Sequence, residues 1–320
     1  MRAAFLALAA LSASAVACLW DSDTLAMETA RFPGIAELIA GNFPRHSKAF
    51  YEWRKKDCEA RLAKDPKQIS LYDDLAVAQH KLGDHRAAIA TMEAKEKVQP
   101  GLYETESNLG TFYIYTGELD AALQHIERVL AINPDAHFGR EKYQRLLVEW
   151  LKAGKPQSLE FHGGVDVPAL GFAWFLMSQL GLDQGSIENW PKQRDAVLKG
   201  IGGMMRFADY DNPLLLEALG DVLCAGHFSQ NGTLLACHAY LVASRRSTSD
   251  EEKQRLWKKM ERAGGTVDQF RPKDVVTALS VAQRKADAFV ARVHRDEAAW
   301  IRAGVDVNAK FAEKYLHPEK

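Results

Sequence analysis

Residues 69–134 read ISLYDDLAVAQHKLGDHRAAIATMEAKEKVQPGLYETESNLGTFYIYTGELDAALQHIERVLAINP, and this stretch contains one pattern written twice. The copies are offset by 34 residues, and their matching positions are Leu82-Gly83-Asp84 with Thr116-Gly117-Glu118, Ala88-Ile89 with Ala122-Leu123, and Pro100 with Pro134. A fixed period of this length, with small residues inside each unit and a proline at its end, is typical of a solenoid of helical hairpins. The glycines suit a left-handed helix stop, and the prolines cannot continue a helical hydrogen-bond ladder. The stretch therefore predicts two consecutive helical hairpins.

Position by position, the two units resemble tetratricopeptide repeats, whose motif runs W-x2-L-G-x2-Y and then alanine, a large residue, a small residue and a closing proline. The matching residues are Tyr72, Leu75, Ala76, Ala88, Met92 and Pro100 in the first unit, and Leu109, Gly110, Tyr113, Ala122, Ile126, Val129 and Pro134 in the second. The sequence departs from the motif at Gln79, Lys95 and Glu106 without a change in spacing, and polar residues there predict thinner packing between the paired helices. The resemblance implies an all-α, tetratricopeptide-type solenoid that binds a protein or peptide.

In this family, positions on the first helix of each unit line a concave groove. Carried onto this chain, the expected partner-binding residues are Asp73, Val77, His80, Thr111, Ile114, Tyr115, Glu141 and Arg145. Family members that clamp a chain-terminal carboxylate place Lys, Asn, Asn, Lys and Arg at five such positions, of which this chain keeps only Arg145. Recognition of a terminal carboxylate in that manner is therefore not expected. The alternative interpretation is that these residues form only a solvated face.

The rest of the chain continues the helical pattern with interruptions. Pro66 lies in the same frame as Pro100 and Pro134, which indicates a capping unit before the repeats. The expected divisions are a signal peptide at 1–17, an N-terminal helical extension or capping repeat at 18–66, the repeats at 67–151, a linker loop at 152–168, a helical region with a degenerate hairpin (213–247) at 169–265, and a long C-terminal helix and tail at 266–320.

Three glycines, Gly200, Gly202 and Gly203, stand inside a predicted helix that begins near Pro191. Glycine weakens a helix interior by roughly 1 kcal/mol relative to alanine, so either a close helix contact or a bend is expected there. The longest helical pattern begins at Pro272 and carries one apolar stripe, which is predicted to cover the core of the last hairpin. A two-stranded coiled coil with another chain is the alternative.

The first residues indicate export. Met1-Arg2 gives a basic start, residues 3–17 are apolar and alanine-rich, and Ala15-Val16-Ala17 has the small-x-small pattern of a cleavage site. The run is shorter than the roughly 20 apolar residues that span a bilayer. Residues 1–17 are therefore predicted to be a removed export signal, which makes Cys18 the first residue of the mature chain.

Cys18 has two interpretations. A cysteine directly after a small-residue cleavage site resembles the lipobox of bacterial lipoproteins, in which the sulfur is acylated and anchors the protein to a membrane. Ala15 stands where that family usually has leucine. The other interpretation is ordinary cleavage with a free or disulfide-bonded Cys18, and the four cysteines permit three complete pairings. Lipidation would place the protein on the outer membrane, and simple cleavage in the periplasm.

Charge and motifs exclude several function classes. The chain has 41 basic and 42 acidic residues, so its net charge of −1 provides no field that attracts nucleic acid, and no nucleic-acid partner is expected. It contains no G-x-S-x-G, H-E-x-x-H, C-x-x-C or phosphate-loop motif, so no catalytic residue and no cofactor are predicted. The first segment also offers Asp21 and Asp23 to a hard cation, but helix capping is the favoured interpretation.

One cluster supports an alternative function. Cys224, His227, Cys237 and His238 offer thiolate and imidazole groups of the kind that bind zinc, which would suit a metal-dependent envelope enzyme or a metal-binding protein. Adjacent helical residues such as Cys237 and His238 point about 100° apart, however, so a closed site would need a distorted turn. The predicted function is therefore an exported scaffold for protein or peptide binding, without a metal.

A wider resemblance concerns most of the chain. Residues 18–25, CLWDSDTL, together with Leu216-Glu217-Ala218-Leu219-Gly220, resemble exported bacterial tetratricopeptide repeat proteins that have no assigned function. This resemblance implies export and architecture only.

Overall fold

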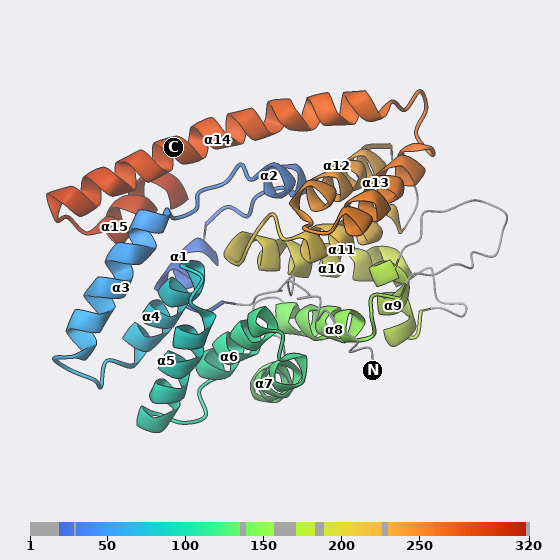
Figure 1. Cartoon of the computed structure of the whole chain (residues 1–320). Helices are drawn as coiled ribbons and strands as arrows, with labels where there is room; N and C mark the ends of the chain where they lie inside the picture. The colour runs from blue at the N-terminus through green and yellow to red at the C-terminus, as the bar shows by residue number, and fades with distance from the viewer. Residues whose placement is uncertain are drawn as a thin grey trace, which may run out of the picture.

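The computed structural model describes residues 19–28, 30–134, 139–156, 171–182, 189–225 and 230–317. Within these ranges every regular element is helical, and helices that follow one another in the chain pack in pairs (Figure 1). The prediction of an all-α solenoid is confirmed. The predicted signal peptide, Cys18, His227 and residues 157–168 of the predicted linker lie outside the described residues.

The helices follow each other without strands in the part of the chain that the structure describes. In chain order they are α1 (Ser22–Glu28), α2 (Ile35–Ala40), α3 (Lys48–Leu62), α4 (Ile69–Lys81), α5 (His85–Val98), α6 (Tyr103–Thr116), α7 (Leu119–Ile132), α8 (Arg140–Lys152), α9 (Gly171–Gln179), α10 (Trp190–Phe207), α11 (Pro213–Cys224), α12 (Gln230–Arg246), α13 (Asp250–Gly264), α14 (Pro272–Ala303), α15 (Val307–Phe311) and the π-helix η3 (Ala312–Leu316).

The duplicated stretch forms two hairpins, α4–α5 and α6–α7. The turn glycines Gly83 and Gly117 have φ of 88° and 81°, a left-handed conformation that glycine adopts without steric cost. Gly110 lies where the two helices of the second hairpin cross, and a Cβ at this position would lie 3.0 Å from Cγ1 of Ile126. Small residues therefore set the close approach of the helices, as the motif predicts.

The polar departures from the motif do not thin the packing, and that prediction is wrong. Lys95 is buried and its Nζ lies 2.6 Å from Oδ2 of Asp73 on the paired helix. Gln79 accepts a hydrogen bond from Thr91 Oγ1 at 2.7 Å. Each polar side chain has a partner across its own hairpin, so a buried polar pair replaces an apolar contact, as burial of polar groups requires.

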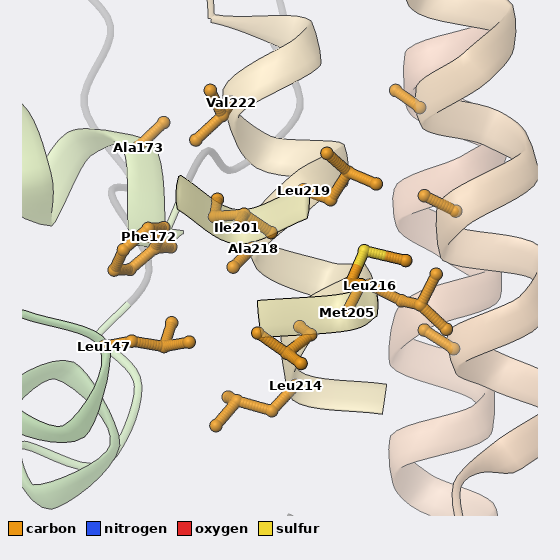
Figure 2. Packing of buried hydrophobic residues seen from close by; sticks show 14 of the residues in the cluster. Leu147, Phe172, Ala173, Ile201, Met205, Leu214, Leu216, Ala218, Leu219 and Val222 are labelled. Carbon is orange, nitrogen blue, oxygen red and sulfur yellow. The ribbon is translucent and has the colours of Figure 1, made fainter. Parts of the chain in front are cut away.

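The second half of the molecule packs around α10 and α11. Figure 2 shows Leu147 and Phe172 facing Ile201 and Ala218 in this core. The glycines of α10 serve close contacts within a continuous helix: a Cβ at Gly200 would lie 2.4 Å from Cδ2 of Tyr143 on α8. Of the two expectations for these glycines, the structure has the close contact.

The long helix α14 runs along one side of the molecule and connects its two ends (Figure 1). It contacts α12, as expected of a helix that covers the last hairpin, and it also contacts α2 and α3 near the chain's beginning. Buried Glu297 on α14 accepts a hydrogen bond from the N–H of Ser47, the residue that caps α3. The apolar stripe of α14 is therefore used within the chain.

Candidate functional site

Most of the predicted groove residues face the protein interior. The side chains of Asp73, Val77, His80, Thr111, Ile114 and Glu141 are buried, whereas Tyr115 and Arg145 are partly exposed. Their partners lie within the chain. Glu141 accepts a hydrogen bond from Tyr103 Oη at 2.7 Å, and Tyr115 Oη donates to Asp209 at 2.7 Å. The concave face is thus covered by other parts of the same chain, and the interpretation as a merely solvated face does not describe these six residues.

The N-terminal segment, residues 19–28, covers one part of this face. Leu19 is 1% exposed and packs with Val77 and Phe112 of the repeats. Asn108 on α6 accepts a hydrogen bond from the N–H of Trp20 through Oδ1 at 2.9 Å and donates to the Trp20 carbonyl through Nδ2, also at 2.9 Å. Both contacts use the main chain of residue 20, so they do not depend on its side chain. The repeat face holds this segment as it would hold a peptide.

The side-chain amide of Asn108 also connects the N-terminal segment to the buried ion pair of Asp73 and Lys95. Nδ2 of Asn108 lies 3.2 Å from Oδ1 of Asp73, whose carboxylate contacts Lys95. This contact orients the Asn108 amide toward Trp20. The ring of Trp20 adds an edge-to-face contact with Tyr103 at a centroid distance of 5.7 Å.

The acidic residues of the segment have structural partners. Asp21 accepts hydrogen bonds from the N–H and Oγ1 of Thr24, both at 2.8 Å, and so begins α1 as the capping interpretation predicts. Asp23 contacts the guanidinium of Arg54 on α3 at 2.5 and 3.0 Å. Burial raises the pKa of Asp21 to about 6, with the nearby charge of Asp23 adding to the effect.

A central cavity of about 230 Å³ lies next to the N-terminal segment. Its walls come from this segment, the α2–α3 connection, α3, α4, and the end of α10 with its connection to α11. In Figure 1 these elements meet around α1. The apolar part of the lining consists mainly of Leu19, Met27, Phe43, Val77 and Phe207.

The charged part of the lining is paired almost completely. Asp211 contacts Arg246 at 2.8 Å, and Lys81 donates to the carbonyl of Ala208 at 2.5 Å. Arg45 donates to the carbonyl of Gly41 and stacks on the ring of Tyr210 at 4.4 Å. Each of these groups therefore has a partner that offsets part of its desolvation.

Arg206 is the exception. It is 8% exposed, its Nη1 is buried without a hydrogen-bond partner, and no ion pair joins it to a carboxylate of the described residues. Its guanidinium lies over the rings of Phe32 and Phe207, with its Cζ 5.4 Å from each ring centroid. Burial lowers its pKa to about 10, and the attraction of Glu28 opposes this shift. Arg206 stays charged at neutral pH in an environment that does not neutralise it.

The cysteine and histidine cluster does not form a metal site in the described residues, where no three His, Cys, Asp or Glu side chains could hold one ion. Cys224 and Cys237 are buried in the core, and burial raises the pKa of both thiols to about 12. The zinc alternative is therefore not carried further.

Two residues of this site were missed at the level of sequence. Asn108 precedes the Leu109-Gly110 pair of the motif, and a polar amide on the inner side of the first helix is a signal that could have been used. Arg206 has no such signal, because nothing around it in the sequence indicates that its carboxylate neighbours are occupied elsewhere.

Comparison with known proteins agrees with this architecture. In the described residues no helix has both the length and the apolar character needed to cross a bilayer. No curated protein matches the chain. Residues 107–136, which contain most of α6 and all of α7, match the family model of the tetratricopeptide repeat. Together with the 34-residue period and the hairpins of α4–α7, this match supports repeats of the tetratricopeptide type in this part of the chain.

Proposed function

We propose that this protein is an exported scaffold that binds a protein or peptide through the concave face of its repeats. Tetratricopeptide repeats commonly bind proteins or peptides. The proposal rests on the two hydrogen bonds that the side-chain amide of Asn108 makes with the main-chain N–H and carbonyl of Trp20. A partner segment that replaces residues 19–20, or extends beside them toward Tyr115 and Arg145, would find main-chain contacts on this face. We assign no catalytic residue, cofactor, metal or nucleic acid to this function.

Export and anchoring belong to the same proposal. The predicted cleavage site ends at Ala17, two residues before Leu19, which packs against the repeats. A mature chain that begins at Cys18 would therefore start directly at the concave face. Acylation of Cys18 would hold this face next to a membrane, where the scaffold would meet partners of the cell envelope.

Photo-crosslinking tests the binding face. A photoreactive amino acid is placed at Arg145, which is partly exposed on α8, and, as a matched control, at Arg284, which is exposed on α14. In envelope extracts we expect one adduct of defined mass from position 145 and none of that mass from position 284. The same adducts from both positions, or none from either, would remove the support for this face.

Metabolic labelling tests the anchor. Cells expressing the full chain are grown with a radiolabelled fatty acid, and the wild type is compared with Cys18→Ala. Label on the wild type alone shows acylation at Cys18. An unlabelled, processed wild type shows cleavage without a lipid, and an unprocessed chain contradicts export.

A further inference from the structure

We propose that the central cavity is a binding site for a small organic carboxylate with an apolar body, and that Arg206 holds its carboxylate. This cavity adjoins the concave face of the repeats, with which it shares Leu19 and Val77, but its assignment does not depend on the function proposed for that face. The assignment rests on three features of the described residues: a partly enclosed cavity, a buried guanidinium without an ion-pair partner, and an apolar lining beside it.

The size of the cavity suits a small ligand. An engineered apolar cavity of about 150 Å³ in another protein binds benzene, so about 230 Å³ accommodates a molecule somewhat larger than one benzene ring. The cavity lies between five elements of the fold and is partly open to solvent, so its ligand would be partly buried. A macromolecular chain would not fit within this volume.

The charge of the ligand follows from Arg206. A buried charge is costly unless it is paired, and the other charged groups of the lining are already engaged: Asp23 with Arg54, Asp211 with Arg246, and Lys81 with the Ala208 carbonyl. Glu28, the acid that acts on Arg206, lies 3.5 Å from Arg140. One negative charge brought by a ligand would neutralise the guanidinium, and a carboxylate matches its two parallel N–H donors.

The rest of the ligand follows from the apolar lining. Leu19 and Met27 of the N-terminal segment, Phe43, Val77 and Phe207 surround the space beside Arg206. A phosphate or sulfate would leave these apolar groups without contacts, and its higher charge would meet Asp21 and Asp209 in the same walls. A short aliphatic or aromatic monocarboxylate would contact the Arg206 guanidinium with its carboxylate and the apolar side chains with its body.

The arrangement also predicts how the unliganded protein behaves. A buried ion without a partner is often replaced by a well-packed hydrophobic residue at no cost in stability, or with a gain. The Arg206 guanidinium already lies over two aromatic rings, so Arg206→Met should retain its packing. We expect the melting temperature of this variant without ligand to equal or exceed that of the wild type.

Thermal unfolding of the full chain tests the site with sodium hexanoate as the probe, and with 1-hexanol and sodium phosphate as controls for the apolar and the anionic part. We expect hexanoate to raise the melting temperature of the wild type with the logarithm of its concentration, as one-site binding to the folded state requires, by about 3 °C at ten times its dissociation constant. Hexanol and phosphate at the same concentrations should not. Arg206→Met should lose the hexanoate effect, whereas Arg194→Met, on the same helix but outside the cavity lining, should keep it.

Each contrary result overturns the assignment. No hexanoate effect on the wild type, an equal effect of phosphate, or an unchanged effect in Arg206→Met would do so. If Arg206→Met does not fold, the guanidinium has a structural partner and the inference fails on that ground. Arg206→Lys keeps the charge without the two-pronged donor set, so we expect about tenfold weaker hexanoate binding by calorimetry, and an unchanged affinity would contradict a bidentate contact.

Discussion

The first repeat hairpin and the α11–α12 hairpin place an acid at the same motif position and neutralise it differently. In α4, Asp73 follows Tyr72 and pairs with Lys95 on α5, the other helix of its own hairpin. In α11, Glu217 follows Leu216, and its carboxylate contacts Lys259 at 3.0 Å and Arg255 at 2.6 Å on α13, the next helix along the chain. The acid at this position is therefore paired within its own hairpin in the first case and with the neighbouring helix in the second.

The second region also buries a further acid. Asp221 accepts hydrogen bonds from Tyr240 Oη at 2.7 Å and from the N–H of Phe172 at 2.8 Å, and Lys259 lies 2.5 Å away. This carboxylate joins α9, α11, α12 and α13. The comparison shows that the motif position directs an acidic side chain toward the interior. The helix that packs over this side chain determines which basic residue pairs with it.

The largest effect is expected from Lys259→Met, which leaves Glu217 and Asp221 buried without their shared ammonium. Removing one partner of a buried pair costs about 3–5 kcal/mol, and two carboxylates are affected here, so we expect a loss near the upper end of that range. Urea unfolding measures the free energy. Lys258→Met, an exposed neighbour, should change it by less than about 0.5 kcal/mol. Equal values for the two variants would show that the cluster does not stabilise the fold.

Lys95→Met should cost somewhat less, about 3 kcal/mol, because only Asp73 loses its counter-ion. Lys97→Met, exposed on the same helix, is the matched control. The double variant Asp73→Asn with Lys95→Met removes both charges and keeps an acceptor for Asn108, so it should recover most of the loss. A double variant as unstable as Lys95→Met alone would show that packing of the lysine chain, rather than charge, is what matters.

Asp21, which packs beside the first repeat hairpin, and Glu217 of α11 should contribute to stability with opposite pH dependence. Burial raises the pKa of Asp21 to about 6, so between about pH 4 and 6 the folded state binds a proton that the unfolded state has released. The contribution of Asp21 to the free energy of unfolding is present at low pH and is lost as the pH rises through 6. The loss is no more than about 3 kcal/mol. Asp21→Asn keeps an acceptor for Thr24 and should remove this dependence, which urea unfolding at pH 4, 5, 6 and 7 measures.

The contribution of Glu217 to stability has the opposite pH dependence. Burial would raise its pKa, but the charges of Lys259 and Arg255 outweigh burial and hold the pKa of Glu217 well below its usual range. Its contribution is therefore present above about pH 4.5 and is lost only as the pH falls toward its folded pKa. Glu217→Gln should reduce stability at pH 7, and the difference from the wild type should shrink in strong acid. A constant difference at every pH would contradict an ionised Glu217.

The smallest effect is expected from adding a methyl group where two helices cross, at Gly220 in the α11–α12 hairpin and at Gly110 in the α6–α7 hairpin. A Cβ at Gly220 would lie 2.4 Å from the ring of Tyr240, which its hydrogen bond to Asp221 holds in place, whereas a Cβ at Gly110 would meet Ile126 Cγ1 at 3.0 Å. Overpacking costs about 1–3 kcal/mol, and the better helix propensity of alanine returns roughly 1 kcal/mol. We expect Gly220→Ala to lose about 2 kcal/mol and Gly110→Ala about 1 kcal/mol or less. The reverse order in thermal unfolding would show that the crossing at Tyr240 relaxes.

The repeats could be predicted because their determinants are local. The glycines at 83 and 117, the small residues at the crossings and the 34-residue period lie within one stretch of the chain. The polar departures could have been interpreted further, since an acid and a lysine at facing motif positions indicate a pair. The groove residues were carried over by position, but their burial depends on a segment far away in the sequence: Trp20 and Asn108 are 88 residues apart.

The sequence by itself determined the helical hairpins, because capping, left-handed stops and close helix contacts are properties of neighbouring residues. Only the tertiary structure decided that the chain's own N-terminal segment covers the concave face, that α14 joins the two ends of the molecule, and that Arg206 is buried without a counter-ion. The physical reason is that the free-energy cost of burying a charged group depends on the groups that surround it in space. Those surroundings come from helices far apart in the chain.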